Sequence, residues 1–470
     1  MHDAVAEPAG MTAGGAGSRG IPASRGSTIA ALALFLLGLA TRWAFSTWVQ
    51  PPEDALYSDM AGYLTRAQLW IQGLADADRT WAVYPPGTHW WMGIALWWFG
   101  VESLSWLGPV QALTGALVVP IVMAITRRAV RAPAAPLVAG GLVAVWPPMV
   151  AFSGYVSSET PYMLLLSASA WLSIRMVETG RGALLAGTAT ALAYLVRPPV
   201  LLTLGLFGAW WLLRRSVLPK ATLGVAFAFA LPCALAVAGA SLRFHELTGQ
   251  WGLISENGAI VRFFAGTDYQ RLETRDAEGN TTSWFSPPPM TALGLDRVFR
   301  FVGHPTDSDI LDAELERHQG GRPFTYRLAL LQRNIRLLAI DNENWPEHER
   351  AGDGFRALVH DVGGALAAFA LLPLAVLGIG CLAVRRNTAI EILALHAFTA
   401  VAVAAVYLGE VRYRVPYDGF LAVLAVYGVL FVAGRAGDAQ PQDRWVRVAV
   451  IASMASLALL LVLPWSAFGS

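Results

Sequence analysis

Carboxylates in the short segments that join apolar runs are the first residues of this chain that could do chemistry. Asp59 follows Ser58 after the first apolar run, and Glu159 follows Ser158 directly before a later one. A carboxylate beside a membrane and aromatic rings is a candidate general base, because poor hydration favours uptake of a proton. A structural alternative stays open for each residue. Asp59 would cap a helix that begins near Ala61, and Glu159 would favour the positive end of a helix dipole.

Arginines in two other short connections could bind an anion. Arg197 lies in one of them, and Arg412 and Arg414 lie in the other. The planar guanidinium group suits two-pronged binding of phosphate, so the pattern predicts a phosphate site. The alternative is a set of internal salt bridges with Glu410 and Asp418.

Several familiar signals of cofactors and of other partners carry little weight here. Asp76-Ala77-Asp78 has the form of a metal-binding DxD motif but stands in a turn without further ligands, and the eight histidines lack zinc spacing. No phosphate loop occurs in a strand–helix context, which argues against ATP-driven transport. We therefore expect no metal and no cofactor. The net charge of +1 gives no reason to expect a nucleic-acid partner.

The elements that must position these residues are membrane helices. The 470 residues are 55% hydrophobic and only 14% charged, far from the quarter or so that is typical of soluble domains. Apolar runs long enough to cross a hydrocarbon core recur along the chain. This composition excludes a soluble enzyme, a secreted disulfide scaffold and a disordered chain, and it predicts an all-α polytopic membrane protein.

Arginine clusters set the predicted topology, because cytoplasmic loops are enriched in positive charge. Eleven spanning helices with the amino terminus inside place every cluster on the cytoplasmic face. The runs lie near 28–49, 105–126, 134–152, 160–176, 182–196, 199–213, 221–242, 358–383, 389–408, 417–434 and 446–465. All the residues considered above as chemical candidates then lie at the outer face.

Two segments between the runs are predicted to lie outside the membrane. The chain divides into a disordered cytoplasmic tail (1–27), a transmembrane module (28–242) with a first outer loop (50–104), an outer loop domain (243–357) and carboxy-terminal helices (358–470). The stretch 85–100 is short for a crossing and rich in tryptophan, which suits a re-entrant or interfacial helix on the outer side. The stretch 324–340 suits an amphipathic helix on the membrane surface.

These residues belong to short motifs that follow one another in a characteristic order along the chain. In chain order they are Ser58-Asp59 with Tyr63, Tyr84-Pro85-Pro86-Gly87, Ser158-Glu159 with Pro161, Leu195-Val196-Arg197-Pro198, Ser255-Glu256-Asn257-Gly258 through Phe263-Phe264-Ala265-Gly266, and Arg412-Tyr413-Arg414-Val415-Pro416. The set resembles the GT-C membrane glycosyltransferases. It is most similar to family 39, which includes protein O-mannosyltransferases and bacterial aminoarabinose transferases. The resemblance covers about residues 28–435.

The resemblance implies an enzyme that moves a hexose or pentose, with inversion, from a polyprenyl-phosphate carrier to an acceptor hydroxyl. The reaction would take place at the outer face of a plasma membrane, with a lipid, glycan or protein as acceptor and membrane lipids around the chain. The lack of eukaryotic appendages and retention signals favours a bacterial inner membrane. Asp59 maps onto the family's base. The predicted phosphate ligands are Arg412, Arg414 and Arg197, and the predicted supporting residues are Glu159, Tyr63, Tyr84, His89 and Tyr413.

The chain departs from the family at two places, and two other functions stay open. Met60 follows Asp59 where O-mannosyltransferases have a glutamate, and the stretch 103–106 lacks an arginine that family members often carry. A transporter or flippase of lipid-linked sugars would need ionisable residues in mid-membrane, where this chain has few. A polysaccharide polymerase or ligase of another fold would share the arginines but not the Ser58-Asp59 motif.

Overall fold

The computed structural model describes most of the chain between the two termini. The described residues are 25–56, 58–74, 79–216, 218, 222–276, 279–285, 297–340, 354–435 and 454. The Asp76-Ala77-Asp78 motif, almost all of the 1–27 tail and almost all of the last apolar run lie outside them.

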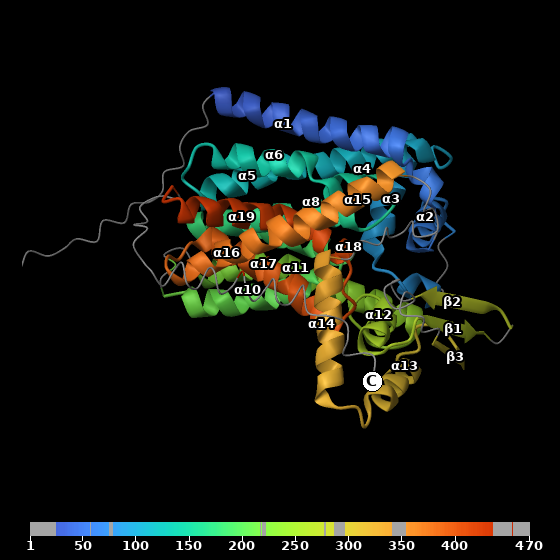
Figure 1. The fold of residues 1–470 in the computed structure, drawn as a ribbon. Helices are drawn as coiled ribbons and strands as arrows, with labels where there is room; N and C mark the ends of the chain where they lie inside the picture. The colour runs from blue at the N-terminus through green and yellow to red at the C-terminus, as the bar shows by residue number, and fades with distance from the viewer. Residues whose placement is uncertain are drawn as a thin grey trace, which may run out of the picture.

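Long helices form one bundle in which most axes run roughly side by side (Figure 1). Its helices are α1 (Arg25–Ala44), α4 (Leu107–Ala116), α5 (Val118–Ala129), α6 (Ala135–Val145), α7 (Pro147–Ala151), α8 (Glu159–Thr179), α9 (Ala183–Val196), α10 (Val200–Arg214), α11 (Leu223–Thr248), α15 (Gly354–Leu366), α16 (Leu372–Gly380), α17 (Thr388–Val406), α18 (Val411–Arg414) and α19 (Asp418–Val432). Short helical turns extend them at η1 (Phe45–Val49), η5 (Phe152–Gly154), η7 (Ala367–Leu371), η8 (Cys381–Ala383) and η9 (Val415–Tyr417). The fold is mostly helical, as the composition predicts.

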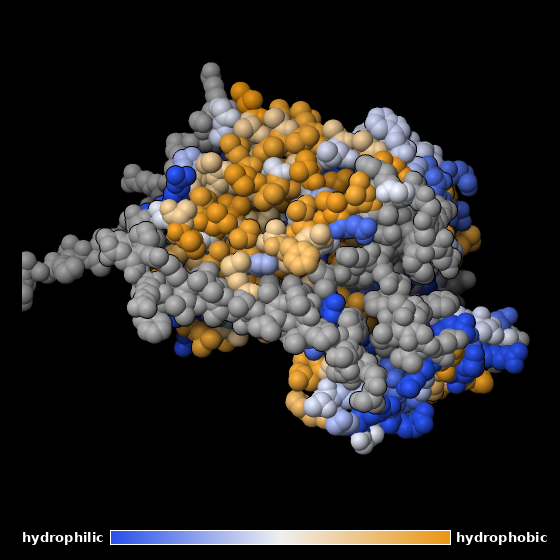
Figure 2. Space-filling model, viewed as in Figure 1, coloured by the Kyte–Doolittle hydropathy of each residue, from blue (hydrophilic) through white to orange (hydrophobic). Residues whose placement is uncertain are grey.

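Six helices among the described residues are long and apolar enough to cross a membrane, or seven if the bent pair of α6 and α7 forms one span. The sequence predicts eleven, and the larger number stays a prediction. Part of the difference lies in α9 and α10, which are apolar but have only 14 and 15 residues. A straight crossing takes about 20 residues. Orange side chains cover much of the bundle's visible flank, as expected of a surface in contact with lipid (Figure 2).

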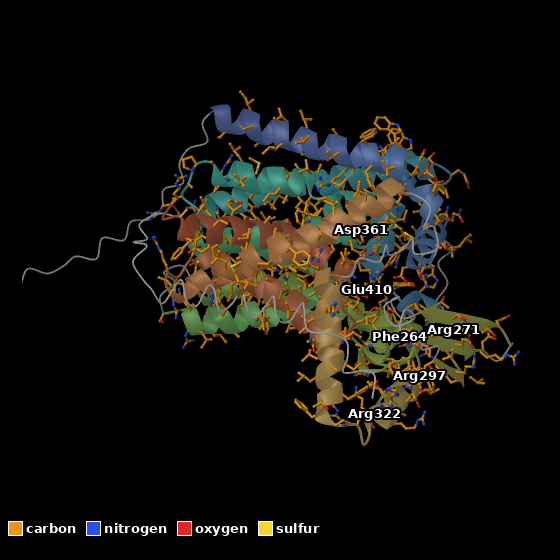
Figure 3. The ribbon with its side chains drawn as sticks, viewed as in Figure 1. Phe264, Arg271, Arg297, Arg322, Asp361 and Glu410 are labelled. Carbon is orange, nitrogen blue, oxygen red and sulfur yellow. The ribbon has the colours of Figure 1, made fainter. Side chains whose placement is uncertain are left out.

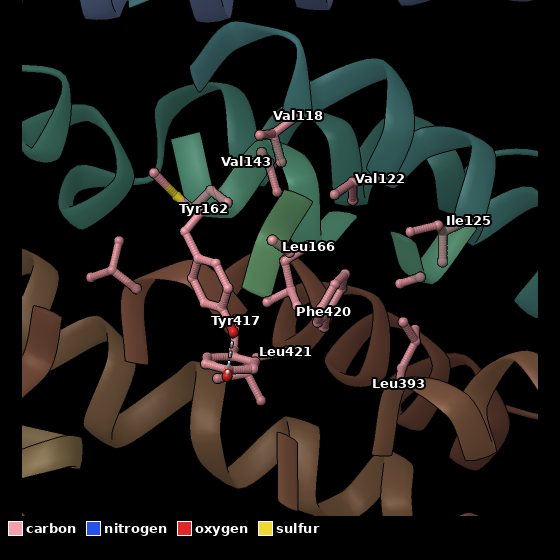
Figure 4. Packing of buried hydrophobic residues seen from close by; sticks show 14 of the residues in the cluster. Val118, Val122, Ile125, Val143, Tyr162, Leu166, Leu393, Tyr417, Phe420 and Leu421 are labelled. Carbon is pink, nitrogen blue, oxygen red and sulfur yellow. Dashed lines mark hydrogen bonds between the residues drawn. The ribbon is translucent and has the colours of Figure 1, made fainter. Parts of the chain in front are cut away.

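The helix that carries the predicted phosphate site leads directly into the centre of the bundle. The span Val411–Val432 has 83% of its most apolar window buried, against 17% for the span Leu223–Thr248 at the periphery. In the core beside it, the hydroxyls of Tyr162 on α8 and Tyr417 on η9 lie 3.2 Å apart (Figure 4). Arg412 and Arg414 therefore lie at the start of the most deeply buried of the candidate spans among the described residues.

The backbones of α16 and α19 pack very closely against each other. A Cβ added at Gly378 would lie 2.1 Å from the Leu424 carbonyl oxygen, and one added at Gly428 would lie 2.7 Å from the Gly378 nitrogen. Backbone packed this closely leaves no room for a side chain, so glycine is required at both positions.

We expect Gly378→Ala to lower the free energy of unfolding by about 1–3 kcal/mol, because the new methyl group would push α16 away from α19. Gly380 is the matched control, since it lies on the same helix and has open space at its Cβ position. Gly380→Ala should leave stability unchanged or raise it slightly. Thermal unfolding in detergent measures both variants, and equal stabilities would show that the packing is looser than described.

Smaller elements gather at one end of the bundle, called the site end from here on. They include η2 (Pro52–Ala55), α2 (Ser58–Ile71), η3 (Arg79–Ala82), α3 (Pro86–Phe99) and η4 (Leu104–Trp106). α3 packs along α2, where a Cβ on Gly93 would lie 2.5 Å from the Trp70 ring. With 14 residues α3 is not among the candidate spans. Its predicted placement as a re-entrant or interfacial helix stays a prediction.

A small unit with its own core lies beside the site end (Figure 1). It contains α12 (Asn257–Gly266), β1 (Arg271–Arg275), β2 (Thr281–Phe285), β3 (Val298–Val302), α13 (Ser308–Gln319) and α14 (Phe324–Ile340). β1 is the central strand, antiparallel to β2 and parallel to β3, with Leu272 fully buried on its inner side. The sheet is an addition to the all-α fold that the composition predicts. α14 has the bounds predicted for a helix at 324–340 and runs across the bundle axes.

Candidate functional site

Asp59 occupies the first turn of α2 and is 9% exposed. The preceding residue, Ser58, has a φ of 50°, a left-handed conformation that is unusual outside glycine. The Asp59 Oδ1 atom accepts a hydrogen bond of 2.7 Å from the Tyr84 hydroxyl, and Oδ2 accepts one of 2.9 Å from Arg412 Nη1. Both carboxylate oxygens therefore bond to distant side chains, and Asp59 is not used as a helix cap.

Arg412 is the centre of this arrangement. Besides the Nη1 bond to Asp59, its Nη2 donates a 3.0 Å hydrogen bond to the Tyr413 hydroxyl. Its Nε forms an ion pair with Glu410, which is 6% exposed. The guanidinium group thus meets two carboxylates and one phenol, each along a different edge.

A second ion pair joins the cluster through Tyr413. Glu159, at the start of α8 and 1% exposed, accepts a 3.0 Å hydrogen bond from Arg197 Nη1. The guanidinium carbons of Arg197 and Arg412 each lie 4.9 Å from the centre of the Tyr413 ring. This contact of cations with an aromatic ring holds the two arginines near each other without direct pairing.

Tyr63 and Tyr84 form the other wall of the cluster, with ring centres 4.8 Å apart. Burial and the neighbouring Asp59 carboxylate raise the pKa of both hydroxyl groups above the ordinary value. Both phenols therefore keep their protons near neutral pH, and that of Tyr84 donates to Asp59. The guanidinium group of Arg66 lies 5.0 Å from the Tyr84 ring.

The predicted supporting residue His89 does not join the cluster. Its ring lies edge-on to Trp81, with centres 5.6 Å apart, and its described contacts do not include Asp59. Burial, with the charges of Arg243 and Arg66, lowers the pKa of His89 to about 3. A neutral ring packed behind the site is the role that the geometry gives this residue.

Arg414 also lies apart from the other predicted phosphate ligands. It forms an internal salt bridge, which was the alternative to phosphate binding. The side chain is 1% exposed and pairs with Asp418 at 3.1 Å. Its Nη1 donates to the carbonyl oxygens of Leu338 at 3.2 Å and Ala339 at 2.6 Å. The physical reason is helical geometry, because residues two apart on a helix point about 200° away from each other. Arg414 therefore points into the protein when Arg412 points to Asp59.

Glu256 anchors the segment that leads to Tyr84. Its backbone nitrogen donates to the Ala82 oxygen at 2.9 Å, and its carboxylate accepts hydrogen bonds from Arg79 at 3.0 Å and Thr306 at 2.6 Å. η3 is thereby tied both to the start of α12 and to the loop before α13. These bonds fix the chain two residues before Tyr84.

Glu410 is the site residue that the sequence analysis considered only as a salt-bridge partner. It lies where α14 meets the bundle (Figure 3), directly before α18. Burial raises the pKa of Glu410, and the nearby Asp59 carboxylate raises it further, although Arg412 opposes the shift. A glutamate two residues from an arginine is a common pattern, so spacing alone did not single it out.

An apolar groove of about 930 Å³ opens on the flank of the bundle between α10 and α11. Its lining includes Leu204, Phe207, Trp211, Ala234, Val237 and Trp251. Arg243, one residue beyond the groove-lining Leu242, donates a 2.8 Å hydrogen bond to the Trp81 oxygen. The groove thus ends beside the segment that supplies Tyr84.

Among the described residues, no group of three or more histidine, cysteine or acidic side chains is placed to hold a metal ion. No family model and no curated protein matches the chain.

Proposed function

We propose that the protein is an inverting glycosyltransferase that uses a polyprenyl-phosphate sugar as donor. The observation that carries the proposal is the position of Asp59, a buried carboxylate held by Arg412 and Tyr84 at the end of an apolar helix bundle. A base, a cation and a neighbouring lipid-facing groove are the parts that this reaction requires. The order of the motifs adds support through their resemblance to the GT-C family.

In the proposed reaction, Asp59 accepts the proton of the acceptor hydroxyl. The acceptor oxygen forms a bond to the anomeric carbon, and the bond from that carbon to the phosphate oxygen breaks on the opposite face. Tyr84 keeps its proton and donates to Asp59 Oδ1, so the hydrogen bond orients the carboxylate. The acceptor is a hydroxyl of a lipid, a glycan or a protein.

Positive charge for the departing phosphate comes from Arg412 and Arg197. Both lie in a poorly hydrated site, where a fixed charge stabilises developing negative charge more strongly than it does in water. Glu159 and Tyr413 hold these two arginines in place. Arg414 is no longer part of the proposed phosphate site, because its bonds go to Asp418 and to backbone carbonyl groups.

The groove between α10 and α11 is the proposed place of the carrier chain. Its lining is almost wholly apolar, and it faces the part of the bundle that lipid would surround. A polyprenyl chain in this groove would bring its head group towards Trp81 and Tyr84. Chemistry at the outer face of a bacterial plasma membrane, with eleven spanning helices, completes the proposal.

A transfer assay on the purified protein in detergent tests the function. Radiolabelled polyprenyl-phosphate sugars, each offered with a total lipid and cell-wall extract, should yield one labelled product with one of the sugars. Tight binding of a polyprenyl phosphate without transfer from any donor would favour a transporter of lipid-linked sugars. A protein that showed no binding and no transfer would contradict the proposal.

We expect Ala234→Trp to raise the KM for a long-chain donor about tenfold, because the indole would displace chain burial worth about 1.4 kcal/mol. A donor on a short farnesyl chain would not reach the filled part of the groove and should keep its KM. Ala33 on α1, exposed but outside the groove, gives the control Ala33→Trp. An unchanged KM for the long-chain donor would place the chain elsewhere.

A further inference from the structure

Each nitrogen of the Arg412 guanidinium group has a partner in this structure. Nη1 bonds to Asp59, Nη2 bonds to Tyr413, and Nε pairs with Glu410. A phosphate that binds one edge of Arg412 with two oxygens, in the two-pronged geometry that a guanidinium group favours, competes with one of these partners. Asp59 has to keep its place to act as the base, and Tyr413 also holds Arg197. Glu410 is the partner whose release leaves the rest of the site intact.

The charges in the cluster favour the uptake of a proton when the donor binds. Three buried carboxylates, on Asp59, Glu159 and Glu410, face two buried guanidinium groups, on Arg197 and Arg412. The formal charge of these five groups is therefore −1 before any donor arrives, and Arg66, 5.0 Å from the Tyr84 ring, adds one positive charge at the rim of the cluster. A polyprenyl-phosphate sugar adds another negative charge, and like charges in a poorly hydrated site repel strongly. Uptake of one proton by the cluster offsets the negative charge that the donor adds.

Glu410 has the surroundings of a group that takes up this proton. Asp59 faces it from α2 and Glu159 faces it from α8, while Arg412 and Tyr413 face it from α18. Burial and the two neighbouring carboxylates raise the pKa of Glu410, whereas Arg412 lowers it. When a phosphate takes the place on Arg412, the contact that favours the charged form of Glu410 is lost. The other influences, which all favour protonation, remain.

We propose that Glu410 takes up one proton when the donor phosphate replaces it on Arg412 Nε, and that it gives this proton to the departing phosphate. This inference rests on the proposed function and deepens it, since it assigns a general acid to the same site. After the bond from the anomeric carbon to oxygen breaks, the Glu410 proton moves to a phosphate oxygen, and the carboxylate pairs again with Arg412. Asp59 releases the acceptor's proton to water. One proton enters and one leaves in each turnover.

Proton uptake on binding can be measured apart from catalysis. The probe is a polyprenyl phosphodiester with a methyl group in place of the sugar, because its one charge does not titrate near neutral pH. Calorimetry of the full chain in detergent, in two buffers of different ionisation enthalpy, gives the number of protons taken up. We expect about one proton for the wild type, and an affinity that falls up to about tenfold per pH unit above the pKa of Glu410. Glu410→Gln should bind with no uptake and with little change between pH 6 and 8.

Turnover supplies a second measurement that a merely structural role would not affect. Glu410→Gln has no proton to give, so its kcat should fall about a hundredfold while its KM for the donor at pH 8 stays equal to that of the wild type or lower. Glu410→Asp should restore uptake of the proton and confirm that the site folds. Glu314, another buried glutamate paired with an arginine, lies in the small unit, and Glu314→Gln is the matched control that should behave like the wild type.

The outcomes separate this inference from the proposed function. Tight binding of the probe by the wild type without proton uptake would overturn the inference and leave the proposed function standing. Unchanged uptake in Glu410→Gln would assign the proton to another carboxylate and would also overturn it. A wild type that neither binds the probe nor transfers sugar would overturn the proposed function itself.

Discussion

Asp59→Asn should lower the rate of sugar transfer by about 10²–10⁴-fold, because the amide has no lone pair basic enough to take the proton of an acceptor hydroxyl. The fold should survive, since asparagine has the same shape and its side-chain oxygen still accepts one of the two hydrogen bonds, the one from Tyr84 or the one from Arg412. Initial rates with the labelled donor measure the loss. Binding of a polyprenyl phosphate should be retained, which separates lost chemistry from lost structure.

Asp54→Asn is the matched control for this variant. Asp54 lies in η2, a few residues earlier in the chain, and is exposed, so the same chemical change there should leave transfer unaffected. Comparable thermal stability of the two variants would show that both are folded. Turnover like that of the wild type in Asp59→Asn would remove Asp59 from the mechanism.

Most of the candidate site could be predicted from the order of residue types along the chain. Asp59 and Arg412, 353 residues apart, meet at 2.9 Å, and Glu159 meets Arg197 at 3.0 Å. Each lies at a helix end, and the predicted topology puts these ends on one side of a membrane, where they would share a plane. The predicted topology alone therefore leads us to expect these residues near one another.

The direction in which a side chain points from its helix could not be predicted from the sequence. Arg412 and Arg414 look equivalent in a short connection, but α18 turns one towards Asp59 and the other towards Asp418. His89 follows the Tyr84-Pro85-Pro86 motif closely, and yet α3 packs its ring against Trp81. Such choices are made by helix packing, which periodicity in a strongly apolar sequence does not specify.

The small unit beside the site end shows a different limit of prediction. The sequence analysis did not predict its sheet, because strands of five residues give weak alternation of polar and apolar residues. Arg333 on α14 is 2% exposed and donates to the carbonyl oxygens of Phe264, Ala265 and Thr267. The hydrogen bonds from this buried arginine to the carbonyl groups at the carboxyl end of α12 depend on tertiary packing. The sequence of α14 alone resembles that of an exposed amphipathic helix.

The contrast between the two arginines of α18 leads to a large expected effect on stability. Arg414→Ala should lower the free energy of unfolding by about 3–5 kcal/mol, because it leaves Asp418 buried and charged without its partner. Trp146, which donates a 2.7 Å hydrogen bond to Asp418, only partly compensates for the loss. Thermal unfolding in detergent measures the change. Arg435→Ala is the control, since Arg435 is exposed just beyond α19.

A double variant distinguishes the lost charge pair from lost phosphate binding. Arg414→Met combined with Asp418→Leu removes both charges, and it should recover most of the stability because the uncompensated carboxylate is gone. The folded fraction of either variant should bind a polyprenyl phosphate as the wild type does, since the proposed phosphate ligands Arg412 and Arg197 are untouched. A stable Arg414→Ala protein with weakened phosphate binding would reverse this assignment. It would return Arg414 to the phosphate site and require α18 to rotate when the donor binds.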